Sequence, residues 1–284
     1  MKIRCGYRIS FNCLNPTPVN LKLHVHPDRV RDLVTVDDMQ TSPQAVVRQC
    51  MDEFGNLITR VHAPAGPITF SSDFVVQDSG LPDRQNPEAE QVLVENLPPE
   101  TLPFLLPSRY CESDQLSDLA WSLFGSTPPG WARVQAIVDY VHHRIQFGYR
   151  FARSNRTAAE GHEEQVGVCR DFAHLAVALC RAMNIPARYC NGYLGDICVP
   201  AVDAPMDFSA WFEAYLEGGW YTFDARHNQP RVGRVVIARG RDAADVAMTH
   251  TFGTAWLTEF QVITEEVGED YTVETPQRSL IAAE

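Results

Sequence analysis

A cysteine at the expected start of a helix is the residue of this chain best placed for chemistry. Cys169 follows Gly167, and the segment 170–183 consists mostly of strong helix formers. Asn184 and Pro186 supply a favoured C-terminal cap and a stop signal. A thiol in the first turn lies near unpaired N–H groups and the positive end of the helix dipole, which lower its pKa. Cys169 is therefore a candidate nucleophile, against the ordinary alternative of a buried structural cysteine.

Two strands joined by a glycine-containing turn form a second segment that bears on chemistry. The segments 207–216 and 220–226 flank Glu217-Gly218-Gly219, which predicts a hairpin. Alternation places one set of residues on an apolar face that should be buried: Ala210, Phe212, Ala214, Leu216, Tyr221 and Phe223. The other face is polar and aromatic and carries Ser209, Trp211, Glu213, Tyr215, Trp220, Thr222 and Asp224. With a two-residue turn, Ser209 and Asp224 share this second face.

Together these segments resemble the transglutaminase-like superfamily, whose pattern is Cys at a helix start, then His-Ala-Trp-x-Glu, then Gly-Trp-x-x-Phe-Asp. The matching segments are Gly167-Val168-Cys169-Arg170-Asp171, Ala210-Trp211-Phe212-Glu213 and Gly219-Trp220-Tyr221-Thr222-Phe223-Asp224. The resemblance extends over roughly residues 104–262. It implies a papain-like core in which Cys169 is the nucleophile and Asp224 orients the base. It also implies a β-rich domain ahead of that core, as in bacterial members, which act mostly as peptidases.

The histidine of the family pattern is replaced by Ser209 in this chain. A Cys-His-Asp triad needs an imidazole that takes the thiol proton and later protonates the leaving amine, and a hydroxyl does neither well. His227 is the best replacement base, provided that the chain bends after Asp224 or at Ala225. His174 lies about 140° around the helix from Cys169 and should point elsewhere. His162, in a polar loop, and His250, near the C-terminus, are weaker alternatives.

Three further residues are candidate binding residues. Gln165 precedes the nucleophile and is a candidate oxyanion-hole donor beside the backbone N–H of Cys169. Trp211 lies on the polar, aromatic face of the hairpin. Arg226 opens a basic loop, 226–234, which is either a contact for a substrate carboxylate, part of the wall of the site, or a solvated turn.

Neither a metal nor another cofactor is expected. The eight cysteines contain no Cys-x-x-Cys pair, which argues against zinc. His24 and His26 are i, i+2 neighbours on a predicted strand, but without a visible third ligand they are expected to face solvent.

Composition and charge bound the remaining possibilities. With 284 residues, 45% hydrophobic and 21% charged, the chain resembles a globular protein with one large or two ordinary domains. The net charge of -12 argues against a nucleic-acid partner. The absence of a long apolar stretch or an export signal predicts no membrane partner, reduced thiols and a cytoplasmic location. The oligomeric state is not predicted.

The expected fold is α+β with two domains and a tail. Residues 1–97 should form a β-rich, sandwich-like N-terminal domain, residues 98–264 a transglutaminase-like core, and residues 265–284 a polar C-terminal tail. The first functional hypothesis is an acyl-transfer peptidase or amidase that acts on a peptide or protein through a Cys169 thioester, with activity reduced or altered by Ser209. The alternative is a catalytically silent relative, a pseudoenzyme that binds peptides or proteins in the same groove. A metal hydrolase built on the histidines is a distant third.

Overall fold

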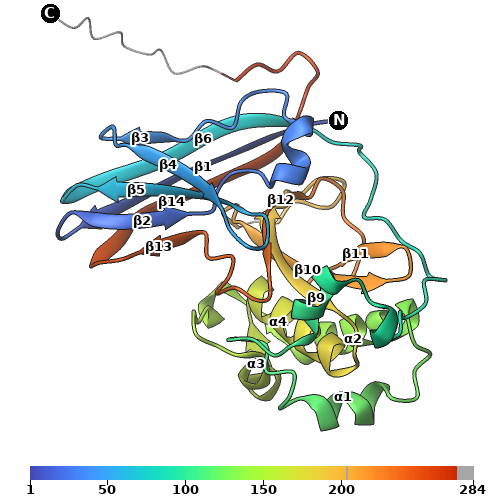
Figure 1. Ribbon diagram of the computed structural model, residues 1–284. Coiled ribbons are helices and arrows are strands. Elements are labelled where there is room, and N and C mark those ends of the chain that lie inside the picture. Colours follow the sequence, from blue (N-terminus) through green and yellow to red (C-terminus); the bar gives the residue numbers. More distant parts are fainter. Residues whose placement is uncertain (203, 274–284) are drawn as a thin grey trace, which may run out of the picture.

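The computed structural model describes residues 1–202 and 204–273. One half of the molecule is a β-sandwich and the other is a sheet covered by helices, so the fold is α+β (Figure 1). The first sandwich sheet has the strand order β14 (Ala255–Val267), β1 (Lys2–Cys13), β6 (Gly66–Gln77) and β3 (Gln40–Ser42). The second has the order β13 (Thr249–Thr251), β2 (Thr17–Leu21), β5 (Leu57–Ala63) and β4 (Val47–Met51).

The second half contains a four-stranded antiparallel sheet and four helices. The sheet order is β11 (Gly219–Phe223), β10 (Ser209–Leu216), β9 (Ala187–Tyr193) and β12 (Val235–Gly240). The helices are α1 (Ser117–Phe124), α2 (Trp131–Arg144), α3 (Ala158–Glu164) and α4 (Cys169–Ala182). Two short strands, β7 (Gln146–Phe147) and β8 (Val166–Gly167), pair in parallel just ahead of α4. Four 3₁₀ turns complete the fold: η1 (Pro27–Asp32), η2 (Val94–Asn96), η3 (Pro99–Leu105) and η4 (Tyr149–Phe151).

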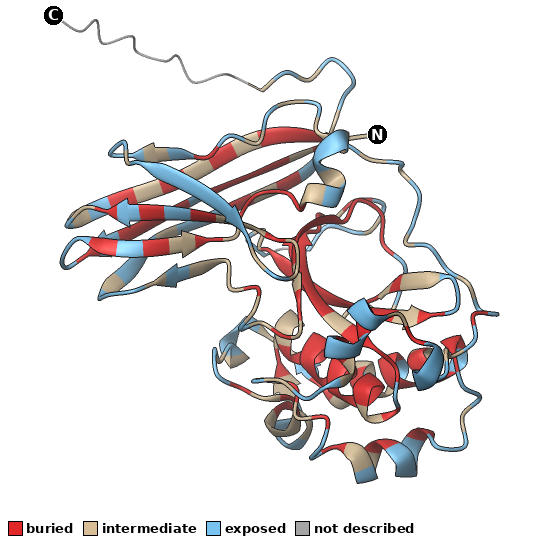
Figure 2. Ribbon diagram, viewed as in Figure 1, coloured by how far each residue is buried: buried red, intermediate tan, exposed pale blue. Residues whose placement is uncertain are grey.

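Helix α4 lies at the centre of the second half. It packs against the sheet and is buried along nearly its whole length, and α1, α2 and α3 contact it in turn (Figure 2). The apolar stripe of α2, which includes Val134, Ile137, Val138 and Val141, joins the same core. Because α4 is held from several sides, its first turn has a fixed position relative to the sheet.

The hairpin of β10 and β11 has the register that the sequence predicts. Phe212 lies opposite Phe223 and Leu216 opposite Gly219, so only Glu217 and Gly218 form the turn. The apolar side chains of the two strands lie in one buried cluster, whose hairpin members are Phe212, Ala214, Leu216, Tyr221 and Phe223. Gly218 in this turn and Gly219 at the start of β11 both have positive φ angles, which glycine adopts without strain.

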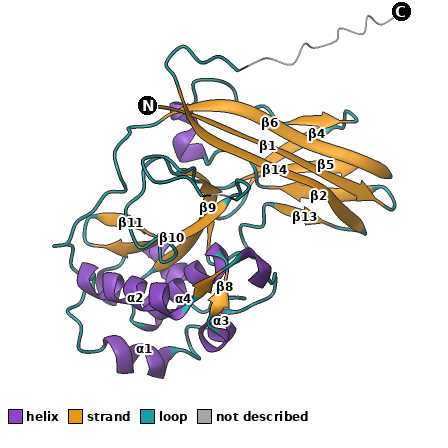
Figure 3. Ribbon diagram, turned by 180° about the vertical axis from the view of Figure 1, so that it is seen from behind, coloured by secondary structure: helices purple, strands orange, loops and turns teal. Residues whose placement is uncertain are grey.

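The C-terminal strands β13 and β14 belong to the sandwich rather than to the helical half (Figure 3). Strand β14 pairs with β1 along its length, from Lys2 opposite Val267 to Cys13 opposite Ala255. The division proposed from the sequence assigned residues up to 264 to the core, but in the structure both ends of the chain build the sandwich. Part of the predicted tail, residues 274–284, lies outside the described residues.

The surroundings of two N-terminal histidines differ from the expectation. His24 and His26 lie beyond β2 and are buried instead of facing solvent. His24 Nδ1 lies 3.2 Å from Asp37, and His26 Nδ1 lies 3.1 Å from Arg239 at the junction of the two halves. In the described part of the chain no three His, Cys, Asp or Glu side chains gather as a metal site. Across residues 1–202 and 204–273, no helix combines the length and apolar character needed to span a bilayer.

Candidate active site

The first turn of α4 is fixed by a buried acid rather than by a Ser or Thr cap. Asp171 Oδ2 accepts hydrogen bonds from the backbone N–H of Val168 at 2.8 Å and from Arg156 at 3.0 Å. Gly167 leaves room for this carboxylate, because a Cβ at residue 167 would lie 2.6 Å from Cβ of Asp171. Gly167 and Asp171 therefore fix the first turn of α4, from which the side chain of Cys169 projects.

Cys169 is half-buried between the helix start and strand β10. Burial raises the pKa of its thiol to about 11, although the Arg226 guanidinium and the nearby backbone N–H of Ala210 act in the opposite direction. The pKa is thus higher than the helix-terminus argument leads one to expect. In this site the loss of hydration of the thiolate is the largest influence on the pKa, ahead of the Arg226 charge and the Ala210 N–H. Formation of the thiolate therefore requires a base that removes the proton.

A tight turn after β11 brings a histidine to the site. Residues 225–227 form the turn, and the backbone N–H of Asn228 bonds to the carbonyl of Asp224 at 2.8 Å. Asp224 Oδ1 accepts the backbone N–H groups of Arg226 and His227, each at 3.0 Å. The ring of His227 thereby folds back, and its Nδ1 lies 2.8 Å from Asp224 Oδ2. This is the bend that a replacement base at residue 227 needs.

Asp224 is buried and ionised. Burial alone raises the pKa of its carboxyl, but Arg234 and the hydrogen bonds from His227 outweigh burial, so the pKa lies well below its usual range. Arg234 Nη2 contacts Asp224 Oδ2 at 2.9 Å. An ionised carboxylate accepts a hydrogen bond from Nδ1–H of His227, which leaves Nε2 of the ring with its lone pair. Nε2 is the nitrogen that can then act as a base.

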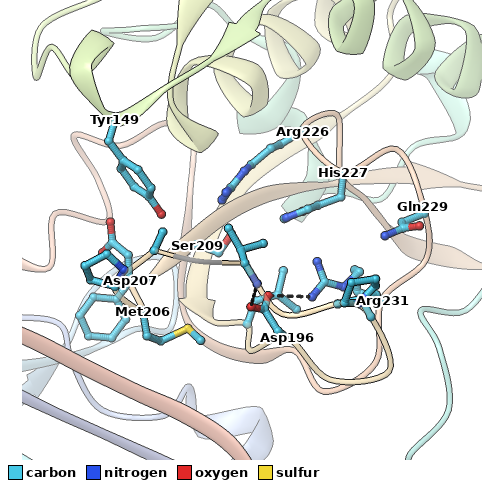
Figure 4. Close-up of a pocket in the computed structure, with 16 residues that line it drawn as sticks. Tyr149, Asp196, Met206, Asp207, Ser209, Arg226, His227, Gln229 and Arg231 are labelled. Atoms are coloured by element: carbon cyan, nitrogen blue, oxygen red, sulfur yellow. Dashed lines mark hydrogen bonds and ion pairs between the residues drawn. The ribbon is translucent and has the colours of Figure 1, made fainter.

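His227 extends into a cavity of about 190 Å³ (Figure 4). Tyr149 and Arg226 reach into the same space, and Asp207 and Ser209 belong to its wall. The Ser209 hydroxyl is buried and has no hydrogen-bond partner among the described residues. Cys169 is not one of the residues that line the cavity, but the charges of Arg226, Asp207 and Asp224 all act on the pKa of its thiol. The cavity wall thus combines a base, an unpaired hydroxyl and a guanidinium whose charge acts on the sulfur.

Arg226 is positioned by aromatic side chains. Its guanidinium lies 3.8 Å from the ring centre of Phe147, a cation–π contact, and close to the Tyr149 hydroxyl. The positive charge near the sulfur favours the thiolate. The basic loop that begins at Arg226 is therefore part of the cavity wall rather than a solvated turn.

Two of the predicted binding residues lie elsewhere. Gln165 is exposed, ends α3 with a positive φ angle, and does not line the cavity. Trp211 is buried on the polar face of β10, but it faces a second cavity, where its ring lies 5.0 Å from Arg234. Trp211 thus contacts the partner of Asp224 instead of lining the cavity with His227.

The other histidines considered are engaged away from the cavity. His162 Nε2 lies 2.7 Å from the Tyr140 hydroxyl. His174 is fully buried, and its Nε2 accepts the backbone N–H of Ala243 at 3.1 Å. His250 is exposed on the edge strand β13.

Sequence reasoning missed three residues of the site. Tyr149 begins the 3₁₀ turn η4 and Asp207 lies just before β10, and no local pattern at either residue indicates that it lies near Cys169. Arg234 was placed in the basic loop without a partner. Its pairing with Asp224 depends on the turn at 225–227 and on the start of β12, which the pattern of residues does not specify.

Comparisons with known proteins agree with this fold. Residues 118–225 match the family model described as the transglutaminase-like superfamily. The chain is similar to the crystal structure of a candidate cysteine protease from Cytophaga hutchinsonii, with 33% identity, a TM-score of 0.82, and coverage of 96% of this chain and 92% of that one. An uncharacterised protein of Mycobacterium leprae is 23% identical over 76% of this chain and 80% of its own. One of Mycobacterium tuberculosis is 26% identical over 69% and 68%.

Proposed function

Because the chain belongs to the transglutaminase-like superfamily, we propose that it is a cysteine peptidase or amidase that acts through a thioester on Cys169. The observation that supports this most is the 2.8 Å contact between His227, which lines the cavity, and Asp224, whose charge also acts on the Cys169 thiol. It supplies an oriented imidazole although Ser209 holds the family's histidine position. The base is thus relocated, and the activity is altered in its geometry rather than lost.

The reaction begins when a peptide or protein substrate enters the cavity. His227 Nε2 removes the Cys169 proton, and the sulfur attacks the carbonyl carbon of an amide. The C–N bond breaks, and the leaving amine takes the proton from the imidazolium, which leaves a thioester. Water then attacks the thioester with His227 again as base. The carboxylic acid is released, and the proton returns to the sulfur.

The raised pKa of Cys169 fits general-base catalysis better than a resting thiolate. A thiol with a pKa of about 11 is protonated at neutral pH, so the proton is transferred during the reaction. Arg226 then lies near the developing negative charge on the sulfur. Asp224 keeps the imidazole in the tautomer that accepts this proton and stabilises the imidazolium that forms.

A silent, peptide-binding groove is the second candidate function. The same raised pKa favours it, because a thiol that stays protonated does not react. In that case the cavity would hold a peptide without cleaving it.

A peptide-cleavage assay separates the two functions. A library of synthetic peptides is incubated with the protein, and new termini are measured by mass spectrometry. We expect cleavage by the wild type and by His250→Ala, a control at an exposed histidine on the edge strand, and none by Cys169→Ala. Binding of library peptides without cleavage by the wild type would favour the silent groove.

A cytoplasmic location is also part of this proposal. All eight cysteines are free thiols, which supports a reducing compartment such as the cytoplasm.

A further inference from the structure

An acidic side chain makes one of the contacts between the core and the segment that joins the two halves of the molecule. Residues 78–93 join β6 to η2 without helix or strand, and most of them are exposed. Asp83 is the exception among its neighbours, because its side chain is 12% exposed. Its backbone N–H bonds to the carbonyl of Arg231 at 2.9 Å, and its Oδ2 accepts the backbone N–H of Arg231 at 2.8 Å.

The Asp83 carboxylate also holds Arg234. Arg234 Nε lies 3.0 Å and 2.9 Å from the two oxygens of Asp83, and Arg234 Nη2 lies 2.9 Å from Asp224 Oδ2. The guanidinium is nearly buried and lies over the ring of Trp211. One cation therefore joins an acid of the linker to the acid that holds His227.

We propose that Asp83 and Arg234 are positioning residues of the active site, which fix the Asp224 carboxylate and set the protonation of His227. The chain of contacts runs from Asp83 to Arg234, then to Asp224, and then to Nδ1 of His227. Each contact is 3.0 Å or shorter. The linker between the two halves is thereby part of the machinery that prepares the base.

The sharing of one oxygen explains how the effect is transmitted. Asp224 Oδ2 accepts from both Arg234 and His227. Arg234 compensates the charge of Asp224 and so weakens its hold on an imidazolium, whereas Asp83 compensates the charge of Arg234. Removing the positive charge should therefore raise the pKa of His227, and removing the negative charge of Asp83 should lower it.

Other charged groups face this pair and stay in place in the test. Arg231 acts on Asp224 from the loop before β12, and Arg226 lies beside His227 on the turn. Cys169 faces Asp224 from the start of α4. None of these groups is changed when Asp83 or Arg234 is replaced. If the two replacements shift the pKa of His227 in opposite directions, the cause is therefore the lost charge of Asp83 or Arg234.

The experiment is an NMR titration of the His227 ring, assigned by comparison with His227→Gln. In Arg234→Gln we expect the pKa of His227 to rise by roughly one unit, and in Asp83→Asn to fall by roughly half a unit. Arg234→Lys keeps the positive charge, so the pKa of His227 in this variant should lie between its values in the wild type and in Arg234→Gln. Asp73→Asn is the matched control, because Asp73 forms a comparable two-contact pair with Arg4 in the sandwich.

The role of Asp83 and Arg234 in an active site rests on the proposed function, but the titration of His227 does not. An unchanged His227 titration in folded Asp83→Asn would overturn it, and so would shifts of the same sign in both variants. If Arg234→Gln does not fold, the downward shift in Asp83→Asn, absent from Asp73→Asn, still decides the question. The titration needs no substrate, so opposite shifts in a protein that cleaves nothing would sink the proposed function and leave this coupling standing.

Discussion

His227 Nδ1 lies 2.8 Å from Asp224 Oδ2, only three residues away along the chain. Strand β10, which lies beside the strand that ends at this acid, begins with Ser209 and carries no histidine. A turn immediately after the acid brings an imidazole to Asp224 instead.

Replacement of the acid should lower both stability and activity. Asp224→Asn leaves Asp83 as the remaining acid that contacts the buried Arg234, and it leaves His227 without an ionised partner. We expect a loss of about 1.5–3 kcal/mol in the free energy of unfolding, measured by denaturant titration. Peptide cleavage should fall by more than a hundredfold. A variant with wild-type cleavage would show that Asp224 does not orient the base.

Low pH should reduce the free energy of unfolding of the wild type through protonation of Asp224. The folded-state pKa of Asp224 lies below its ordinary value, so its contribution is complete above the unfolded pKa of about 4 and is lost as the pH falls through the folded pKa. We expect the difference in unfolding free energy between the wild type and Asp224→Asn to shrink from pH 5 to pH 2. A difference that stays constant over this range would contradict the assignment.

The thiol of Cys169 should react slowly at neutral pH without substrate. With a pKa of about 11, its alkylation by iodoacetamide should keep rising up to that pH. Cys50 and Cys198, which are exposed, serve as internal controls in the same mass-spectrometric digest. Half-maximal alkylation of Cys169 below pH 9 would mean that the thiolate is stabilised more strongly than burial allows.

The stability of the first turn of α4 should depend on Gly167 and Asp171. Asp171→Ala removes the ion pair with the buried Arg156, which keeps Glu164 as its acid, and removes the bond to the Val168 N–H. We expect a loss of about 1.5–3 kcal/mol in the free energy of unfolding. Gly167→Ala should be destabilising for a different reason, because its Cβ would overlap Asp171. Unchanged unfolding midpoints in both variants would remove Asp171 from this role.

Part of this arrangement can be predicted from the sequence. The helix at Cys169 and the hairpin of β10 and β11 follow from helix formers, alternation and a glycine turn, which are local signals. The pairing of β14 with β1 does not follow from local signals, because the residue pattern of a strand does not indicate which strand it pairs with. The raised pKa of Cys169 likewise depends on packing around the sulfur. His227 required a bend at Ala225, which the sequence allowed but did not specify.

The central claim is that His227 is the base for Cys169, and acylation by p-nitrophenyl acetate tests it most directly. The burst of p-nitrophenol is measured at neutral pH, with the acetyl group located on Cys169 by mass spectrometry. Relative to the wild type, His227→Ala should lower the burst rate by roughly 10²–10⁴-fold. Ser209→Ala and His250→Ala should stay within about fivefold, and Ser209→His should give no gain. A His227→Ala variant that acylates at the wild-type rate would contradict the claim.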